Sequence, residues 1–423
     1  MSLFDGKRLD NSTFKLDLDR MRRGWYADKY FTNIQTILAT LAKEGYTYQG
    51  KHHRLPASIT PEGIPCGDIE VEMQWFTRRP GTTVICGIDK ALTILREATG
   101  HFESGHFINT SDQLQVWAVH DGCTTRYDGN PLQVMPVMRV RGRYRDFSML
   151  ETSTLGILAR ASRVATNVYD TLVAAKGKQM LFFPARFDMD EVQAADGYAY
   201  QIAIQRYNLD YGSTVGPFVS TDAQGDWWNG TGGGTISHSA IASFLGDASE
   251  IMLQFARLLP VEVPRIALVD FENDSVGTSM RIARDMFTRY IQLMEAGNPQ
   301  EAQRFRLDGV RLDTSSGMRD ISIEPIGDPA LDLGVNPRLV FNVRQALDHC
   351  ADTWNLPPSQ LETARQFCRQ VRIAVGSYFF DNHGPTNTDF TADVVRVKVH
   401  DALLDMAKAG RHAADNPELQ RVW

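Results

Sequence analysis

Residues 230–239 read Gly-Thr-Gly-Gly-Gly-Thr-Ile-Ser-His-Ser and place one histidine, His238, at the start of a predicted helix. Apolar residues recur at helical spacing from Ala240 to Ala256 and predict that helix. Glycines let backbone N–H groups approach a ligand closely, and the first turn of a helix favours an anion. A histidine there could donate a hydrogen bond to phosphate or become phosphorylated as a nucleophile. A purely structural turn has the same composition, so the run alone leaves both interpretations open.

Three charged residues each follow a short apolar run that reads as a β-strand. Residues 179–185 lead to Arg186, residues 265–269 to Asp270, and residues 309–312 to Asp313. In a β/α barrel the carboxyl ends of the strands carry the active site, so these residues are expected in one pocket. The structural alternative is that each carboxylate only caps the helix that follows it.

The pattern of apolar residues changes at about residue 150. Before it, strand-like runs follow one helical segment; after it, apolar strands alternate with amphipathic helices, which is typical of β/α units with a parallel sheet. The expected helices are 30–43, 151–175, 189–206, 237–258, 277–296, 337–353 and 358–369, and the expected early strands are 69–76, 83–88, 114–120 and 135–140. The polar segment 207–236 reads as a long ordered loop. We therefore predict an α/β protein with a change of architecture near residue 150.

Composition argues against several classes of protein. The chain of 423 residues is long enough for two or three domains, and its formal net charge of −7 argues against nucleic-acid binding. No apolar run approaches the roughly 20 residues that span a bilayer, and no signal-peptide pattern is present, so no membrane partner is expected. The five cysteines are scattered without a CxxC pair, which argues against a zinc ribbon or a disulfide framework and favours a cytoplasmic protein.

Several short motifs occur in the order in which one known family has them. They are Ala27-Asp-Lys-Tyr-Phe, Val71-Glu-Met-Gln-Trp-Phe, Cys86-Gly-Ile-Asp, Gly142-Arg-Tyr-Arg-Asp-Phe, Glu151-Thr, Leu155-Gly-Ile-Leu, Phe183-Pro-Ala-Arg, Gly234-Thr-Ile-Ser-His-Ser, Leu268-Val-Asp, Gly309-Val-Arg-Leu-Asp-Thr, Asp389-Phe-Thr-Ala-Asp-Val-Val and Lys408-Ala-Gly-Arg. By these motifs the chain resembles nicotinate phosphoribosyltransferase, particularly its compact archaeal-type form, and more distantly nicotinamide phosphoribosyltransferase. The matches are collinear over almost the whole chain.

The resemblance implies the type II phosphoribosyltransferase fold. This fold would comprise an irregular β/α barrel at 151–384 and an N-terminal α/β domain at 1–150, which residues 385–423 return to complete. A homodimer with active sites shared between subunits is also implied. The implied reaction joins nicotinate to phosphoribosyl diphosphate, giving nicotinate mononucleotide and diphosphate in NAD salvage, with ATP hydrolysis coupled through a phosphohistidine. Mg²⁺ is expected because the diphosphate leaving group needs to be neutralised.

Within this resemblance, His238 matches the phosphorylated histidine. Asp270 and Asp313 match carboxylates that orient the histidine and hold ribose hydroxyls or Mg²⁺. The hydroxyl groups expected to donate to a phosphoryl group on the histidine are those of Thr235, Ser237 and Ser239.

The pyridine ring is expected between two aromatic side chains. Tyr30 and Phe183 match these aromatics, and the tyrosine would come from the partner subunit. Phe183 could instead be a core residue, because it alternates with Phe182 and one of the two must point inward.

Basic side chains are expected to bind the acidic groups of the substrates. Arg186 and Arg311 suit the nicotinate carboxylate or phosphate oxygens through their planar guanidinium groups. Lys408 and Arg411 belong to the C-terminal match and are expected to contact phosphates, with a solvated basic face as the alternative.

The chain departs from the family pattern at several places, two of which bear directly on the substrate sites. Phe183-Pro-Ala-Arg-Phe stands where the family usually has Phe-Gly-x-Arg-Arg, so the glycine and the second arginine are missing. The Ser-Gly-Gly strand end that grips the 5′-phosphate in relatives is also missing, which leaves Gly376 and Ser377 to form that site. Two alternatives follow: a homologue that uses another pyridine base such as nicotinamide, and a non-catalytic paralogue with weakened phosphate binding.

Overall fold

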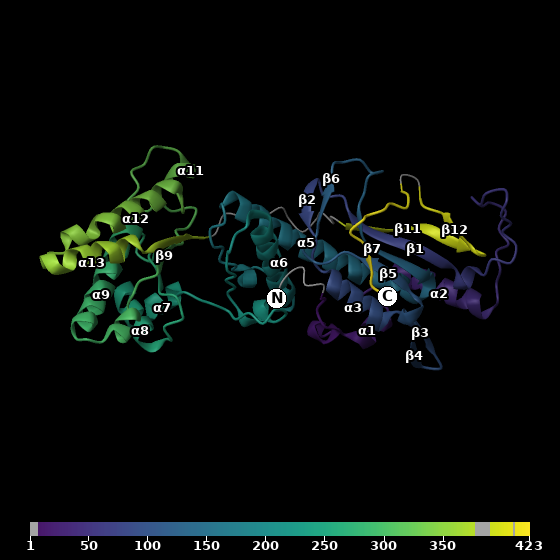
Figure 1. Cartoon of the computed structure of the whole chain (residues 1–423), viewed down its shortest axis with the longest axis horizontal. Coiled ribbons are helices and arrows are strands. Elements are labelled where there is room, and N and C mark those ends of the chain that lie inside the picture. Colours follow the sequence, from purple (N-terminus) through teal and green to yellow (C-terminus); the bar gives the residue numbers. More distant parts are fainter. Residues whose placement is uncertain (1–6, 377–389, 409–410) are drawn as a thin grey trace. The chain divides into compact units, whose positions relative to one another are not determined.

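The computed structural model describes residues 7–376, 390–408 and 411–423. These residues form two units (Figure 1). Unit 1 comprises the described residues up to Gly232 together with those from Phe390 onward, and unit 2 runs from Gly233 to Gly376. The sequence analysis expects one domain at 1–150 with 385–423 and a second at 151–384. These bounds differ from those of the two units, and the predicted domains stay a prediction.

Unit 1 is built on an antiparallel six-stranded sheet to which the C-terminal segment contributes. Its strands are β1 (Glu70–Thr77), β5 (Gln115–Ala118), β7 (Pro136–Arg143), β11 (Phe390–Val399), β12 (Ala402–Asp405) and β13 (Gln420–Arg421), in the spatial order β12-β11-β1-β7-β5-β13. Strand β1 pairs with β7 on one side and with β11 on the other. The expected return of the C-terminal segment to the N-terminal α/β region is thereby confirmed.

A buried carboxylate fixes this strand pairing. Glu72 of β1 is fully buried and accepts hydrogen bonds from Arg141 of β7 at 2.6 Å and from Arg396 of β11 at 2.8 Å. Both arginines stand directly opposite Glu72 in the sheet register. Loss of either guanidinium would leave a buried charge poorly compensated, so the two arginines favour this register over one shifted by a residue.

Helices pack on the apolar face of the sheet and on one another. They are α1 (Leu18–Arg22), α2 (Lys29–Lys43), α3 (Ile88–Ala98), α4 (Tyr144–Phe147), α5 (Glu151–Ala174) and α6 (Gln193–Tyr211), and the remaining strand pairs are β2 (Gly81–Val84) with β6 (Thr124–Tyr127) and β3 (Gly100–Glu103) with β4 (His106–Asn109). Met73 and Trp75 of β1 share a core with Leu92 and Leu95 of α3. Helices α5 and α6 form a second core with each other.

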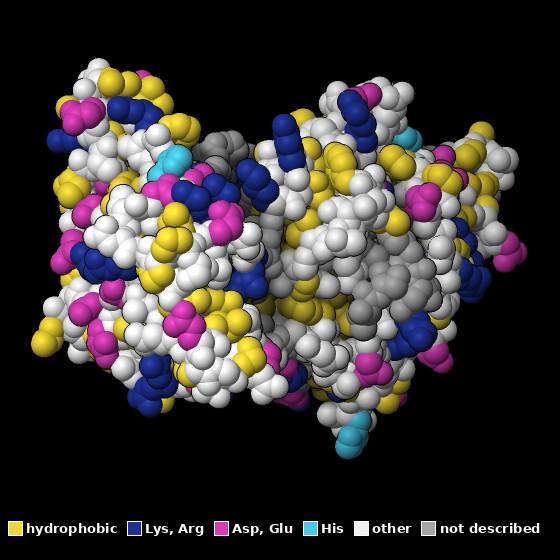
Figure 2. Space-filling model, turned by 60° about the vertical axis from the view of Figure 1, so that its left-hand side comes forward, with side chains coloured by type: hydrophobic (Ala, Val, Ile, Leu, Met, Phe, Trp, Pro, Cys, Tyr) yellow, Lys and Arg dark blue, Asp and Glu magenta, His cyan; other side chains and the backbone are white. Residues whose placement is uncertain are grey.

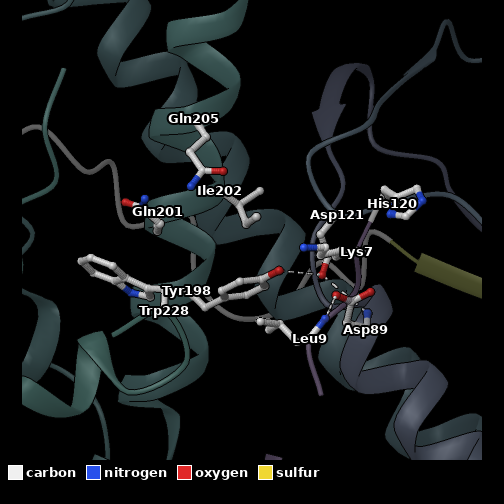
Figure 3. Close-up of a pocket in the computed structure, with 10 residues that line it drawn as sticks. All are labelled: Lys7, Leu9, Asp89, His120, Asp121, Tyr198, Gln201, Ile202, Gln205 and Trp228. Atoms are coloured by element: carbon white, nitrogen blue, oxygen red, sulfur yellow. Dashed lines mark hydrogen bonds between the residues drawn. The ribbon is translucent and has the colours of Figure 1, made fainter. Parts of the chain in front are cut away.

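A polar cluster joins α3, α6 and the N-terminal segment of unit 1 beside a cavity of about 30 Å³ (Figure 3). The Asp121 carboxylate accepts hydrogen bonds from the Ile88 N–H at 2.8 Å and the Tyr198 hydroxyl at 3.3 Å. The Asp89 carboxylate accepts one from the Leu9 N–H at 2.8 Å. Burial, followed by the neighbouring Asp89 charge, raises the pKa of Asp121 to about 7.

Unit 2 contains a three-stranded parallel sheet with helices packed against it. The strands are β8 (Ile266–Leu268), β9 (Gly309–Leu312) and β10 (Arg372–Val375), in the order β10-β9-β8. The helices are α7 (His238–Ser243), α8 (Ala248–Leu258), α9 (Ser275–Glu295), α10 (Pro299–Gln303), α11 (Pro329–Asp332), α12 (Pro337–His349) and α13 (Pro358–Arg369). The mixed α/β class expected from the sequence is confirmed, although the strands of the described residues form open sheets and no closed barrel.

One expected helix, 237–258, is in fact two. Leu245 and Gly246 have φ values of 56° and 88°, and this left-handed turn ends α7 before α8 begins. The Asp247 side chain then caps α8 by accepting hydrogen bonds from two backbone N–H groups of its first turn. Apolar periodicity continues through the turn, which is why the sequence pattern predicts a single helix.

The surface carries charges of both signs. On the face drawn in Figure 2, Lys and Arg side chains are interspersed with Asp and Glu side chains. None of the helices in the described part of the chain is long and apolar enough to cross a membrane.

The raised pKa of Asp121 makes the stability of unit 1 depend on pH. A carboxyl whose pKa rises from 3.8 to about 7 on folding stabilises the fold below its unfolded pKa, and this contribution is lost as the pH rises through about 7. Asp121→Asn mimics the protonated carboxyl. We therefore expect its free energy of unfolding, relative to the wild type, to increase by roughly 1 to 4 kcal/mol between about pH 5 and about pH 8 in urea titrations.

The matched control for this experiment is Asp19→Asn, since the Asp19 side chain is 75% exposed. The difference between this control and the wild type should stay constant over the same pH range. A constant difference for Asp121→Asn as well would contradict the raised pKa.

Candidate active site

The carboxyl ends of β8, β9 and β10 lie at one edge of the parallel sheet in unit 2. The pairing is continuous to the ends of the strands, so the residues that follow them stand at matching levels. Those residues are Asp270 after β8, Asp313 after β9 and Gly376 after β10. A Cβ atom on Gly376 would lie 3.7 Å from Asp313 Oδ1, which places the glycine beside that carboxylate. Three predicted site residues are thus brought together.

His238 is the first residue of α7 and contacts Asp270. Its Nε2 atom lies 3.0 Å from Asp270 Oδ2, and the Phe271 ring stacks on the imidazole with centroids 6.5 Å apart. The His238 side chain is 45% exposed, whereas that of Asp270 is only 8% exposed. A buried carboxylate therefore orients a histidine that solvent or a ligand can reach, an arrangement suited to a nucleophile or a base.

The hydroxyl groups around His238 are partly engaged with the protein itself. Ser237 is the N-cap of α7; its Oγ accepts a hydrogen bond from the Ala240 N–H at 3.2 Å and lies 2.7 Å from Ser239 Oγ. The Thr235 hydroxyl donates to the Ile236 carbonyl at 3.3 Å. Because α7 has only six residues, an anion here would depend on these hydroxyls more than on a helix dipole.

Arg311 connects the strand end to the glycine-rich run. Its Nη1 atom lies 3.3 Å from Asp313 Oδ2, and its Nη2 atom donates to the Ile236 carbonyl at 3.5 Å. The guanidinium therefore supplies positive charge between the Asp313 carboxylate and the segment that carries His238.

Three buried polar atoms at this edge have no hydrogen-bond partner among the described residues: Asp270 Oδ1, Arg311 Nε and Thr314 Oγ1. Buried polar groups are nearly always paired in folded proteins, so these atoms are suited to water or a ligand. Within the described residues no three His, Cys, Asp or Glu side chains form a complete metal site. Mg²⁺ commonly takes only one or two carboxylates and completes its shell with water and substrate phosphates, so a magnesium site at Asp270 and Asp313 stays a prediction.

Neither carboxylate caps a helix, so the structural alternative is wrong for both. The N-cap of α9 is Asp274, whose side chain accepts from the Gly277 N–H. The first α-helix after Asp313 is α11, and its N-cap is Asp328.

The turn at residues 183–186 lies in unit 1. Phe182 is the core residue of the alternating pair: it is 5% exposed and stacks on Tyr200 with centroids 4.7 Å apart. Phe183 is half-buried and meets the Phe218 ring edge-on at 6.1 Å. Arg186 ends the short turn that follows, and it is exposed.

The other expected substrate contacts in unit 1 differ in their surroundings. Tyr30 on α2 is 62% exposed, and its hydroxyl donates to Asp28 at 3.2 Å. Lys408 is exposed. The Arg411 side chain is 11% exposed and pairs with Asp393 at 2.6 Å, so a phosphate would have to compete with that carboxylate. Ser377 lies outside the described residues, and the roles of all these residues stay predictions.

Two residues of the site were not predicted from the sequence. Phe271 and Thr314 each directly follow a carboxylate at a strand end, and one stacks on His238 while the other contributes an unpartnered hydroxyl. Their position after the predicted carboxylates is the signal that could have found them.

Comparison with known proteins supports the fold. The family model described as quinolinate phosphoribosyl transferase, N-terminal domain, matches residues 59–162. Nicotinate-nucleotide pyrophosphorylase from Pyrococcus furiosus is 21% identical with a TM-score of 0.60, covering 97% of this chain and 85% of that chain. Human nicotinic acid phosphoribosyltransferase is 15% identical with a TM-score of 0.49, covering 88% of this chain and 74% of that chain. NadC from Streptococcus pyogenes is 12% identical with a TM-score of 0.44, covering 89% of this chain and 99% of that chain. The match to the Pyrococcus furiosus structure shows that the chain has the type II phosphoribosyltransferase fold expected from its sequence.

The environment of Asp270 predicts that it contributes little to stability. Asp270→Ala removes one buried oxygen that has no partner and one that contacts only the partly exposed His238 among the described side chains, so we expect the free energy of unfolding to change by less than about 1 kcal/mol in urea titrations. The matched control, Asp274→Ala, removes the cap of α9 and should cost roughly 0.5–2 kcal/mol. A larger loss for Asp270→Ala than for Asp274→Ala would argue for a structural role.

Proposed function

We propose that the chain is a phosphoribosyltransferase that joins nicotinate to phosphoribosyl diphosphate, forming nicotinate mononucleotide and diphosphate. The observation that carries this proposal is the contact between His238 and the buried Asp270 at the strand edge that also bears Asp313 and Gly376. The type II phosphoribosyltransferase fold supports the reaction class.

The proposed reaction breaks the bond between ribose C1 and the diphosphate and forms a bond from C1 to the ring nitrogen of the base. The ribosyl centre gains positive character as the leaving group departs, and the carboxylates of Asp270 and Asp313 stabilise that charge or hold the ribose hydroxyls. Arg311 lies beside Asp313, where it can offset phosphate charge. Mg²⁺ bound at these carboxylates would help to neutralise the diphosphate. Gly376 has no side chain beside Asp313, which leaves room for a phosphate to approach the backbone.

ATP coupling is proposed to act through His238. Asp270 holds the imidazole through Nε2 and would stabilise the positive charge that develops as the ring takes a phosphoryl group. The exposure of the ring leaves a path for that group. Ser239 and Thr235 are the nearby hydroxyls suited to donate to it.

For the base, we propose that Tyr30 and Phe183 sandwich the pyridine ring and that Arg186 pairs with its carboxylate. Arg186 is exposed and makes no ion pair with another described residue, so it is available to a substrate. Quinolinate is the second candidate base, because the matching family model is that of quinolinate phosphoribosyl transferase. Nicotinamide remains an alternative because Phe187 replaces the second arginine of the family pattern.

The assay for this proposal uses the full chain with phosphoribosyl diphosphate, Mg²⁺ and one of three bases: nicotinate, quinolinate or nicotinamide. We expect mononucleotide from nicotinate, formed faster with ATP, as measured by liquid chromatography. His238→Ala should lower the ATP-stimulated rate by roughly 100-fold, because it removes the group that accepts the phosphoryl.

The control variant is His106→Ala, which removes an exposed histidine of the β3–β4 pair and should leave the rate unchanged. Product from quinolinate or nicotinamide alone would replace nicotinate as the base. No product from any base would favour a non-catalytic paralogue.

We also propose a homodimer in which Tyr30 completes the base site of the partner subunit. Trp25, Tyr30 and Ile37, on and beside α2, are 69%, 62% and 52% exposed, an apolar surface that a second copy would cover. A tyrosine buried inside its own subunit would have contradicted this model.

A mixing experiment tests the shared site. Tyr30→Ala and Asp270→Ala should each be nearly inactive alone, whereas their mixed dimers would contain one intact site. Co-expression of the two variants should therefore restore about a quarter of wild-type activity, since about half of random dimers are mixed. Activity no higher than that of the separate variants would show that each subunit uses its own Tyr30.

A further inference from the structure

Two cysteines of unit 2 lie in contact although they are separated along the chain. The Sγ atoms of Cys350 and Cys368 are 3.5 Å apart, and the side chains are 2% and 0% exposed. Cys350 directly follows α12, at the start of the short helix Cys350–Thr353, and Cys368 lies in the last turn of α13. Their sulfur atoms therefore bridge two consecutive helices inside the main core of unit 2.

We propose that Cys350 and Cys368 form a redox-active dithiol, which a hydroperoxide oxidises to an intrachain disulfide. In the first step one sulfur attacks a peroxide oxygen; the O–O bond breaks, water leaves and the sulfur becomes a sulfenic acid. In the second step the other sulfur attacks this sulfenic sulfur, the S–S bond forms and a second water leaves. Two thiols lose two electrons and two protons, and one hydrogen peroxide becomes two waters.

The surroundings assign different roles to the two sulfurs. The hydrogen bond between the thiols lowers the pKa of Cys350 and raises that of Cys368, which burial raises further. The Arg344 guanidinium, which donates to the Cys368 carbonyl at 3.1 Å, favours the thiolate form of either sulfur. Because the thiolate is the nucleophile, Cys350 is expected to attack and Cys368 to resolve, and formation of the disulfide does not depend on which sulfur attacks first.

Burial selects the oxidant. Both sulfurs lie in the core among Leu347, Ala351 and Phe367, so we expect only a reagent as small as hydrogen peroxide to reach them, during local opening of the core. The two sulfurs already touch, and they need to approach by only about 1.5 Å to reach the length of a disulfide bond. The other three cysteines are also free thiols and serve as internal controls: Cys66, Cys86 and Cys123.

The disulfide would restrain the helix that leads into β10. Arg344 donates to the Cys368 carbonyl and, at 2.6 Å, to the Val371 carbonyl, directly before β10 begins. The same strand ends beside Gly376 at the candidate phosphate position. An effect of oxidation on activity would rest on the proposed function, whereas formation of the disulfide does not.

Peptide mapping tests the disulfide directly. The full chain is treated with hydrogen peroxide, the peroxide is removed, the remaining thiols are blocked with N-ethylmaleimide in urea, and the protein is digested with trypsin without reduction. Cleavage after Arg344, Arg365 and Arg369 puts Cys350 in peptide 345–365 and Cys368 in peptide 366–369. We expect these peptides to be joined with the loss of two hydrogens, and to separate again after dithiothreitol. Peptides that remain separate, or a bridge to another cysteine, would overturn the proposal.

Variants identify the attacking sulfur. With Cys368→Ser, the Cys350 sulfenic acid has no resolving partner and should be trapped by dimedone added together with urea, which exposes the buried sulfur, whereas Cys350→Ser should give little adduct at Cys368. Equal labelling of both would reverse or remove the assigned roles. Because serine is polar in a core, Cys350→Ala and Cys368→Ala repeat the test with circular dichroism as the folding control. The wild-type map also stands without any variant.

Discussion

The parallel pairing of β8, β9 and β10 is the constraint on which the candidate site depends. Side chains alternate between the two faces of a strand, so a slip of one residue in β8 or β9 would move Asp270 or Asp313 away from its neighbours. The apolar core holds the register: Ala267, Leu268 and Val310 are fully buried, together with the facing side chains of α9 and α12. The aligned strand ends then place the negative charges of Asp270 and Asp313 at matching levels, an arrangement that stability alone does not require.

The buried carboxylates of Glu72 and Asp270 have different surroundings. In unit 1, the Glu72 carboxylate is matched by two arginines directly opposite it in the register, and its role is to fix the strand pairing. In unit 2, Asp270 keeps one oxygen without a partner and Arg311 keeps an N–H group without one, within the described residues. Unsatisfied buried polar atoms also occur among the described residues of unit 1, among them Arg139 Nε near Glu72, so an unsatisfied atom alone does not identify a binding site. The chemistry is proposed for the strand edge of unit 2 because an unsatisfied carboxylate oxygen, an arginine and a partly exposed histidine meet there.

The sequence predicts the elements better than it predicts their breaks and contacts. The helices at 277–296 and 358–369 are found within two residues of their expected bounds, because their apolar positions face one core and their ends carry caps or proline. The turn at Leu245 escaped prediction because a leucine with positive φ leaves no mark on the periodicity. Periodicity also cannot say which of Phe182 and Phe183 points inward, since both are equally apolar. Asp270 and Asp313 were predicted because strand ends in β/α units are recognisable, but their freedom from capping is visible only when the actual caps are located.

The contact between Cys350 and Cys368 is another feature that the sequence alone does not predict. A search for close spacing finds no pair, because Cys350 and Cys368 are separated by a turn and most of α13. Two consecutive helices that pack on one core can nevertheless bring positions that are distant in sequence into van der Waals contact. A cysteine packs there as a small apolar side chain would. Packing alone explains two buried cysteines. Packing does not require the two sulfurs to face each other, nor to lie near an arginine that donates a hydrogen bond to the Val371 carbonyl directly before β10. This geometry distinguishes a redox pair from two ordinary core residues.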